Sequence, residues 1–390
     1  MLALSPCVVG ADETVAVLPL SNAGQSRNLD WVGYSLGEAL LRSFSAAGAT
    51  VVPPQDRDQV LSEMGVAKFA LLTRASAMEI AVNLNASQVV YGEFEVKPAP
   101  AGTSGSKGVL SLTCHVVDVR RVRRLGAFQE SGPLEELSSL QQLVSWKALG
   151  VAMPRLAVTE EEFRRSNPAV RLDALESYVR GLMATAPDQK HKLLATAARL
   201  APGFSAPCFE LGRLNLFALK NYPAAAEWLQ KVASTDFHYR EALFYLGVAR
   251  LRTGEFQAAA EVLRKLADEV PLPEVLNNLG VARTRLNDPA AAELFRKAIE
   301  SNPSDPDLHF NAGYALWRQS AFADAVEEFR ASLQRHPEDE SATLMLGRCL
   351  KQQPYRAGDL KTEGLERVKT EYNESAWLAL KAMMAPKQER

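Results

Sequence analysis

The chain has 390 residues, which is enough for two or three domains. Lys plus Arg number 44 against 46 Asp plus Glu, and the resulting net charge of -2 argues against nucleic acid or an anionic membrane as the main partner. The four cysteines, Cys7, Cys114, Cys208 and Cys349, form no C-x-x-C pair, so they predict neither a zinc site nor a disulfide framework.

Residues 1–12 are expected to be a leader or the remnant of a signal peptide. The stretch is apolar up to Ala11, and Val9, Gly10 and Ala11 resemble the small residues that precede a signal-peptidase site. The apolar run is short, however, and no basic segment precedes it. A secretory signal that begins further upstream and a short leader on a cytosolic protein are both consistent with this pattern. No apolar run approaches the roughly 20 residues of a membrane span.

Residues 13–151 predict an α+β domain with a mixed sheet. Short β-rich runs alternate with helical periodicity in the first part, and two runs with hairpin character follow a turn-rich loop at 98–108. We expect strands at 14–20, 49–54, 87–96, 109–119 and 123–131, and helices at 28–45, 77–84 and 133–151. This order places parallel strands first and antiparallel strands last.

The stretch "GYSLG" satisfies G-x-S-x-G, the pattern of a serine hydrolase. A nucleophilic serine requires a strand that runs directly into it, but the first strand ends many residues before Ser35. Val32, Leu36, Leu40 and Phe44 instead form one helical stripe. Ser35 is therefore expected to be a helix residue, no catalytic residues are assigned, and a serine hydrolase is the third and most distant alternative.

Other sites of chemistry are not expected. The stretch "GTSGSKG" lacks the spacing of a phosphate-binding loop, and no histidine has metal-ligand spacing, so we expect no metal and no cofactor. The basic run Arg120, Arg121, Arg123 and Arg124 has two readings. It could meet an acidic partner, or it could protect an exposed strand edge with charge.

The first domain resembles a known family. "VAVLPLSN", the helix "LDWVGYSLGEALLRSF" and Val89, Val90, Tyr91 and Gly92 in a strand carry the resemblance. Residues 13–151 resemble the amino-terminal domain of TolB and the related FlgO-like domains. Bacterial envelope proteins and cytoplasmic signalling proteins both join this domain type to helical repeats, so the resemblance implies either location.

The second half is repetitive. Gly247, Gly280 and Gly313 lie 33 residues apart, and Pro271, Pro303 and Pro337 are placed to end the second helix of each unit. Over 172–354 the sequence resembles the tetratricopeptide repeat family, which implies an all-α solenoid of five or six helix pairs. A junction is expected at 152–171, and residues 355–390 are expected to form helices that cap the solenoid.

In this repeat family the first helix of each pair lines the concave face. The polar and aromatic positions that recur there make up a candidate partner-binding surface: Phe244, Arg252, Asn278, Arg285, Phe310, Asn311, Tyr314, Trp317, Arg318 and Lys351. An asparagine and cation ladder with aromatic neighbours suits an extended peptide. A concave face that binds no partner is the alternative, because the repeat pattern itself favours asparagine and a basic residue at these positions.

The expected function is a non-enzymatic scaffold for protein–protein interaction, with a protein or peptide partner on the concave face, in a bacterial cell envelope. The alternative is a cytoplasmic adaptor or signalling subunit of the same architecture. Neither reading involves nucleic acid or a membrane span, although association with a membrane surface is compatible with the first.

Overall fold

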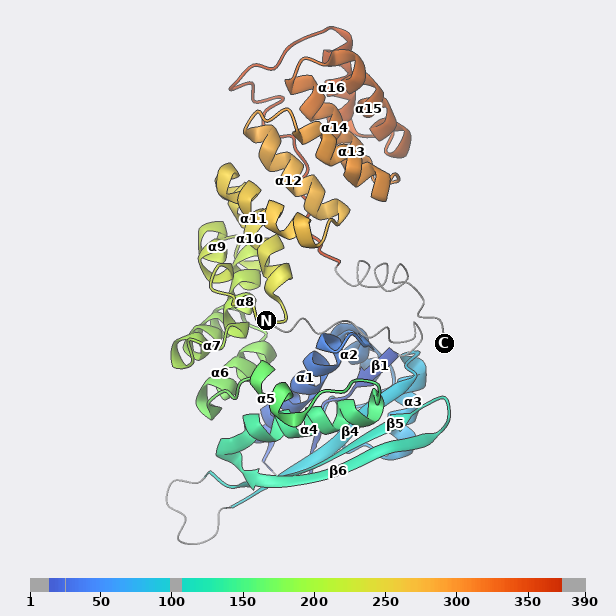
Figure 1. Ribbon diagram of the computed structural model, residues 1–390, viewed down its shortest axis with the longest axis vertical. Coiled ribbons are helices and arrows are strands. Elements are labelled where there is room, and N and C mark those ends of the chain that lie inside the picture. Colours follow the sequence, from blue (N-terminus) through green and yellow to red (C-terminus); the bar gives the residue numbers. More distant parts are fainter. Residues whose placement is uncertain (1–13, 25, 99–106, 374–390) are drawn as a thin grey trace. The chain divides into compact units, whose positions relative to one another are not determined.

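A computed structural model describes residues 14–24, 26–98 and 107–373 (Figure 1). The expected leader at 1–12 and most of the loop at 98–108 lie outside the described residues. The chain divides into two compact units, Met1–Pro207 and Cys208–Arg390. Each unit is described by itself.

The first unit is built on one six-stranded mixed sheet with the strand order β3-β1-β4-β5-β6, in which β2 also pairs with β4. The strands are β1 (Thr14–Val17), β2 (Ser21–Asn22), β3 (Thr50–Val51), β4 (Gln88–Lys97), β5 (Val109–Asp118) and β6 (Arg123–Pro133). β1 is parallel to β3 and β4, whereas β4, β5 and β6 form an antiparallel meander. The mixed sheet expected from the sequence is confirmed.

Helices cover both faces of this sheet (Figure 1). Ala16, Val89 and Val117 pack against α2 (Pro54–Glu63) and α3 (Arg74–Asn83). The opposite face carries α1 (Asp30–Ala46) and α4 (Leu137–Ala152), which also contact each other. Side chains alternate between the two faces of a strand, so the apolar strands can fill both layers.

The "GYSLG" stretch lies within α1, as expected. A Cβ atom on Gly33 would lie 2.0 Å from the backbone oxygen of Leu20, so this glycine lets the helix approach the chain between β1 and β2. Ser35 is buried, and its hydroxyl accepts a hydrogen bond from Nε2 of Gln141 on α4 at 2.6 Å. The two glycines of the motif therefore serve packing, and Ser35 joins two helices.

The junction expected at 152–171 is docked on the first unit. It contains the helix α5 (Glu160–Ser166), which begins with a capping box between Thr159 and Glu162. The indole N–H of Trp146 on α4 donates to the backbone oxygen of Val158 at 2.9 Å. The next helices, α6 (Leu172–Met183) and α7 (Pro187–Leu200), form a pair, and α6 contacts α1 and α4. The boundary of the compact units thus lies after this first helix pair, beyond the expected junction.

The second unit is a series of antiparallel helix pairs. Its elements are α8 (Ala206–Arg213), the π-helical turn η3 (Leu214–Ala218), α9 (Tyr222–Leu229), α10 (Tyr239–Thr253), α11 (Phe256–Glu269), α12 (Pro273–Arg285), α13 (Ala291–Ser301), α14 (Pro306–Arg318), α15 (Phe322–Arg335) and α16 (Glu340–Leu350). A Cβ atom on Gly247 would lie 2.6 Å from Leu263, and one on Gly280 would lie 2.7 Å from Phe295. The recurring glycine thus allows close packing within each pair.

The helices expected at 355–390 are absent from residues 355–373, the part of this range that the structure describes. Residues 355–373 form turns and extended chain with no helix, and residues 374–390 lie outside the described residues. Gly358 and Gly364 adopt positive φ angles of 78° and 80°, which interrupt a right-handed helix. Beyond Gly364 the chain runs along the repeats and pairs with their side chains.

Across 14–24, 26–98 and 107–373, none of the helices combines the length and apolarity that crossing a membrane requires.

Candidate functional site: the groove along the helix pairs

The site lies along the first helices of successive pairs, α10, α12 and α14. Residues 362–373, called here the groove segment, lie against these helices. The groove segment runs opposite to the order of the repeats: Arg367 pairs with α14, Lys369 pairs with α12, and Tyr372 packs on α10. A piece of this chain therefore occupies the surface that the sequence assigned to a partner.

Two asparagines bind the backbone of the groove segment. The side-chain amide of Asn311 donates to the backbone oxygen of Arg367 at 2.8 Å, and its carbonyl accepts from the Arg367 N–H at 2.8 Å. Asn278 makes the same pair of bonds with Lys369, also at 2.8 Å each. Because the two paired residues lie two apart, the segment is extended here.

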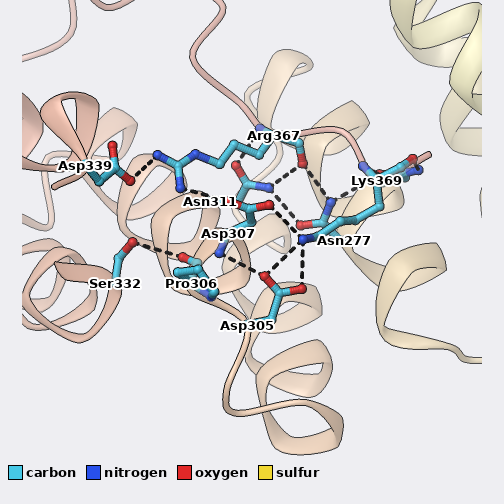
Figure 2. A network of polar contacts seen from close by, with 10 residues as sticks. Asn277, Asp305, Pro306, Asp307, Asn311, Ser332, Asp339, Arg367 and Lys369 are labelled. Carbon is cyan, nitrogen blue, oxygen red and sulfur yellow. Dashed lines mark hydrogen bonds and ion pairs between the residues drawn. The ribbon is translucent and has the colours of Figure 1, made fainter. Parts of the chain in front are cut away.

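A third asparagine ties this ladder together. Asn277 donates to the backbone oxygen of Arg367 at 2.9 Å and accepts from the amide of Asn311 at 2.7 Å (Figure 2). Asn277, Asn278 and Asn311 are at most 1% exposed. Buried amides are costly without partners, and the segment supplies the partners of the Asn311 carbonyl and of the Asn278 amide group.

Aromatic side chains support the segment between the polar anchors. The Tyr314 hydroxyl donates to the backbone oxygen of Thr362 at 2.7 Å. The guanidinium carbon of Arg367 lies 3.8 Å from the ring centroid of Phe310, a cation–π distance. The rings of Phe244 and Tyr372 lie 5.2 Å apart.

The basic residues of the groove segment meet three aspartates. Arg367 pairs with Asp307 at 2.8 Å and also with Asp339, whereas Lys369 lies 2.7 Å from both Asp305 and Asp307 (Figure 2).

These ion pairs shift the pKa values of both sides. Burial alone would raise the pKa of Asp307, but Lys369 and Arg367 outweigh it and lower the value. Burial likewise opposes the charge on Lys369, and its two aspartate partners nevertheless raise its pKa. Both shifts favour the ionised pair.

Glu366, the acidic residue that precedes Arg367 in the groove segment, lies near two arginines of the repeats. Glu366 lies 3.0 Å from Arg285 and 3.9 Å from Arg318, and its side chain is 3% exposed. Glu363 lies 3.8 Å from Arg285. Burial raises the pKa of Glu366 above its ordinary value, despite the two guanidinium groups. The groove thus presents an acidic subsite and a basic subsite side by side.

The structure brings most of the candidate binding residues to this segment. Phe244, Asn278, Arg285, Phe310, Asn311, Tyr314 and Arg318 contact residues 362–373. Trp317 instead donates to the backbone of Gln353, which precedes the segment. Arg252 and Lys351 are exposed, and among the described residues neither forms a hydrogen bond, ion pair or cation–π contact with the segment.

Sequence reasoning missed the acidic subsite and the occupant. Asp305 and Asp339 are the N-caps of α14 and α16, so helix capping alone explains an aspartate at either position. Asn277 is adjacent to Asn278, and this doubled asparagine was the one signal of an amide cluster.

The other candidate sites in the described residues offer less support for a function. Among the described residues, no group of histidine, cysteine and acidic side chains could hold a metal ion. Arg120 and Arg121 lie in the turn between β5 and β6, where Arg121 is 3.6 Å from Asp118, and Arg123 and Arg124 begin the edge strand β6. The pKa of the buried Cys349 thiol is raised to about 11, which disfavours a reactive thiolate.

The helix pairs and their groove define a class of repeat protein. Residues 233–272, 277–340 and 310–354 match the tetratricopeptide repeat family model. The repeats expected from the sequence are therefore confirmed over this part of the chain. The resemblance of residues 13–151 to TolB and FlgO-like domains stays a prediction.

One curated protein is similar to part of this chain. The chain is 26% identical over 174 residues to the anaphase-promoting complex subunit CDC16 of Saccharomyces cerevisiae, a match that covers 42% of this chain and 20% of that protein. The chain therefore spans only about a fifth of this curated relative.

Two solved structures are also similar. One is MamA from Desulfovibrio magneticus RS-1, with a TM-score of 0.38 and 20% identity over 41% of this chain and 92% of that one. The other is YrrB, a tetratricopeptide repeat protein with an unusual peptide-binding site, with a TM-score of 0.35 and 17% identity over 50% of this chain and 93% of that one.

Proposed function

We propose that this protein is a non-enzymatic interaction scaffold whose repeat groove holds an extended segment of a protein partner, in a bacterial cell envelope. One observation carries the proposal. Asn311 bonds both the backbone N–H and the backbone oxygen of Arg367, and Asn278 bonds the same two groups of Lys369. The two bonded residues lie two apart in an extended chain. Backbone pairing of this kind gives affinity for peptides, while the flanking side-chain subsites give specificity.

The proposal needs a groove that a partner can enter. In the full chain the groove segment competes from within the molecule, and tethering gives it an effective concentration of the order of millimolar. A variant with Arg367→Glu and Lys369→Glu places negative charges against Asp305, Asp307 and Asp339. This release variant is expected to free the groove without altering the repeats themselves.

The test is a fluorescence anisotropy titration with a labelled synthetic peptide, TEGLERVKTEYN, which has the sequence of residues 362–373. The release variant is expected to bind this peptide. Adding Asn278→Ala and Asn311→Ala is expected to abolish binding, whereas Arg264→Ala, an exposed arginine on α11, leaves it unchanged. A folded release variant that binds no peptide would contradict the proposed function.

The cytoplasmic adaptor is the second candidate, because the FlgO-like resemblance fits both locations. A fluorescent fusion that carries the natural upstream sequence separates the two. Export of the fusion supports the envelope, and retention in the cytoplasm supports the adaptor.

A further inference from the structure

We infer that the groove selects a partner segment with a defined charge pattern: glutamate or another residue without positive charge, then arginine, then any residue, then lysine. This inference rests on the proposed function and names the partner's chemistry. The pattern is that of Glu366, Arg367 and Lys369, whose side chains fill the two subsites. The chain's own segment then acts as a built-in competitor for the partner.

The acidic subsite sets the two basic positions. Asp307 lies within 2.8 Å of both Arg367 and Lys369, so one carboxylate is shared by two cations. Two further aspartates flank this carboxylate: Asp305 pairs with Lys369, and Asp339 pairs with Arg367. Three carboxylates gathered at one place repel each other unless cations lie between them. An apolar or acidic segment therefore leaves this repulsion unrelieved.

The arginine position is more specific than the lysine position. The Arg367 side chain reaches two aspartates through two different nitrogen atoms while its guanidinium carbon lies 3.8 Å from the Phe310 ring centroid. A planar guanidinium can do both at once, whereas an ammonium offers a compact charge without a flat face. Lys369 instead donates from one nitrogen to Asp305 and Asp307, which suits an ammonium.

The basic subsite sets the position just before the arginine. Arg285 and Arg318 converge on Glu366, and only 8% of the Arg318 side chain is exposed. A partner with lysine or arginine at this position would bury like charges together. Rejection of such segments is as much a part of specificity as attraction of the correct one.

The backbone ladder fixes the register of this pattern. Asn311 and Asn278 accept only residues two apart, and these are the two basic residues. A shift of the peptide by one residue would carry its side chains to the other side of the extended chain. The asparagine ladder and the two charged subsites therefore favour the same register of the bound peptide.

The test compares three labelled peptides on the release variant, with circular dichroism to establish that the variant is folded. The first has the sequence of residues 362–373, the second is the same composition in scrambled order, and the third, TEGLKEVETEYN, reverses the three key charges. We expect the first to bind at least tenfold more tightly than either of the others. We also expect the wild-type chain to bind the first peptide at least tenfold more weakly than the release variant does.

A groove variant supplies the matched control. Asp307→Asn in the release variant is expected to weaken the first peptide about tenfold and to leave a peptide with alanine at the two basic positions nearly unaffected. Asp324→Asn, an exposed aspartate on α15, changes neither.

The outcomes separate the two proposals. Equal affinity for the first and scrambled peptides would overturn the charge pattern while the scaffold function stands. Absence of binding by all three peptides would overturn both. Should the release variant not fold, the milder variant with Arg367→Ala and Lys369→Ala serves the same comparison.

Discussion

Glu366 and Asp307 meet opposite charges in the groove, and their pKa values shift in opposite directions. The pKa of Glu366 is raised above 4.5 by burial, so its contribution to docking is largest at low pH and declines as the pH rises through the raised value. The pKa of Asp307 is lowered below 3.8, because Lys369 and Arg367 outweigh its burial. Its contribution is present above 3.8 and is lost as the pH falls through the lowered value. Docking should therefore be strongest between these two transitions.

The raised pKa of Glu366 predicts the effect of Glu366→Gln. Glutamine cannot titrate, so the decline of docking above pH 4.5 should disappear in this variant. Hydrogen exchange of the segment amides, measured over a pH series and corrected for intrinsic rates, follows docking. Glu371→Gln, at an exposed position, should keep the slope of the wild type. An unchanged slope in Glu366→Gln would show that this carboxylate does not control docking.

Ser35→Ala tests the role of the "GYSLG" stretch. The substitution removes the acceptor of the buried Gln141 amide, so the free energy of unfolding should fall by about 1–3 kcal/mol. Denaturant titration measures this change. Loss of an esterase activity in the variant, with stability unchanged, would contradict the account of Ser35 as a helix-packing residue.

At the scale of elements, the glycine of each first helix decides how closely a pair packs. A Cβ atom on Gly280 would lie 2.7 Å from the Phe295 ring, but one on Gly347 would meet nothing within 4 Å. The two residues hold the same place in the repeat, and the second lies on α16, where the chain leaves the helical pattern. The same glycine thus has different consequences in the two helices.

Gly280→Ala and Gly347→Ala should therefore have different effects on stability. Overpacking at Gly280 should lower the free energy of unfolding by about 1–3 kcal/mol. Alanine at Gly347 should leave stability unchanged or raise it by up to about 1 kcal/mol, because alanine favours helix. Thermal unfolding of the two variants compares them directly. Equal destabilisation would mean that another helix packs on α16.

The helices and strands were largely predictable, whereas the groove occupant was not. Period and glycine spacing determine a helix pair locally, so the repeats could be read from the sequence. Residues 362–373 are rich in charged residues, which also suits a capping helix. Their extended form is instead stabilised by Asn278 and Asn311, which lie far away in the sequence. Pairing at such a distance leaves no local pattern.

On the scale of the whole molecule, the boundary between the two compact units falls between Pro207 and Cys208. The sequence suggested separation at 152–171, because prolines and charges gather there. The helix α5 nevertheless begins with a capping box and contacts α4, and α6 contacts α1 and α4. Contacts of this kind depend on the three-dimensional arrangement, so composition alone does not reveal them.

Fragments test this boundary. A chain of residues 1–207 should unfold cooperatively, whereas a chain of residues 1–152 should be markedly less stable, because it loses the helices that cover α1 and α4. Denaturant unfolding followed by circular dichroism compares the two fragments. Equal stability of the two fragments would instead place the end of the first domain at the junction, residues 152–171.

The most direct test of the central claim is hydrogen exchange at the backbone amides of Arg367 and Lys369 in the full chain. If the asparagine ladder holds an extended segment in the repeat groove, both amides should be protected in the wild type, and the protection should be lost with Asn278→Ala and Asn311→Ala. Exchange of both amides in the wild type at the rate of an unstructured peptide would contradict the account.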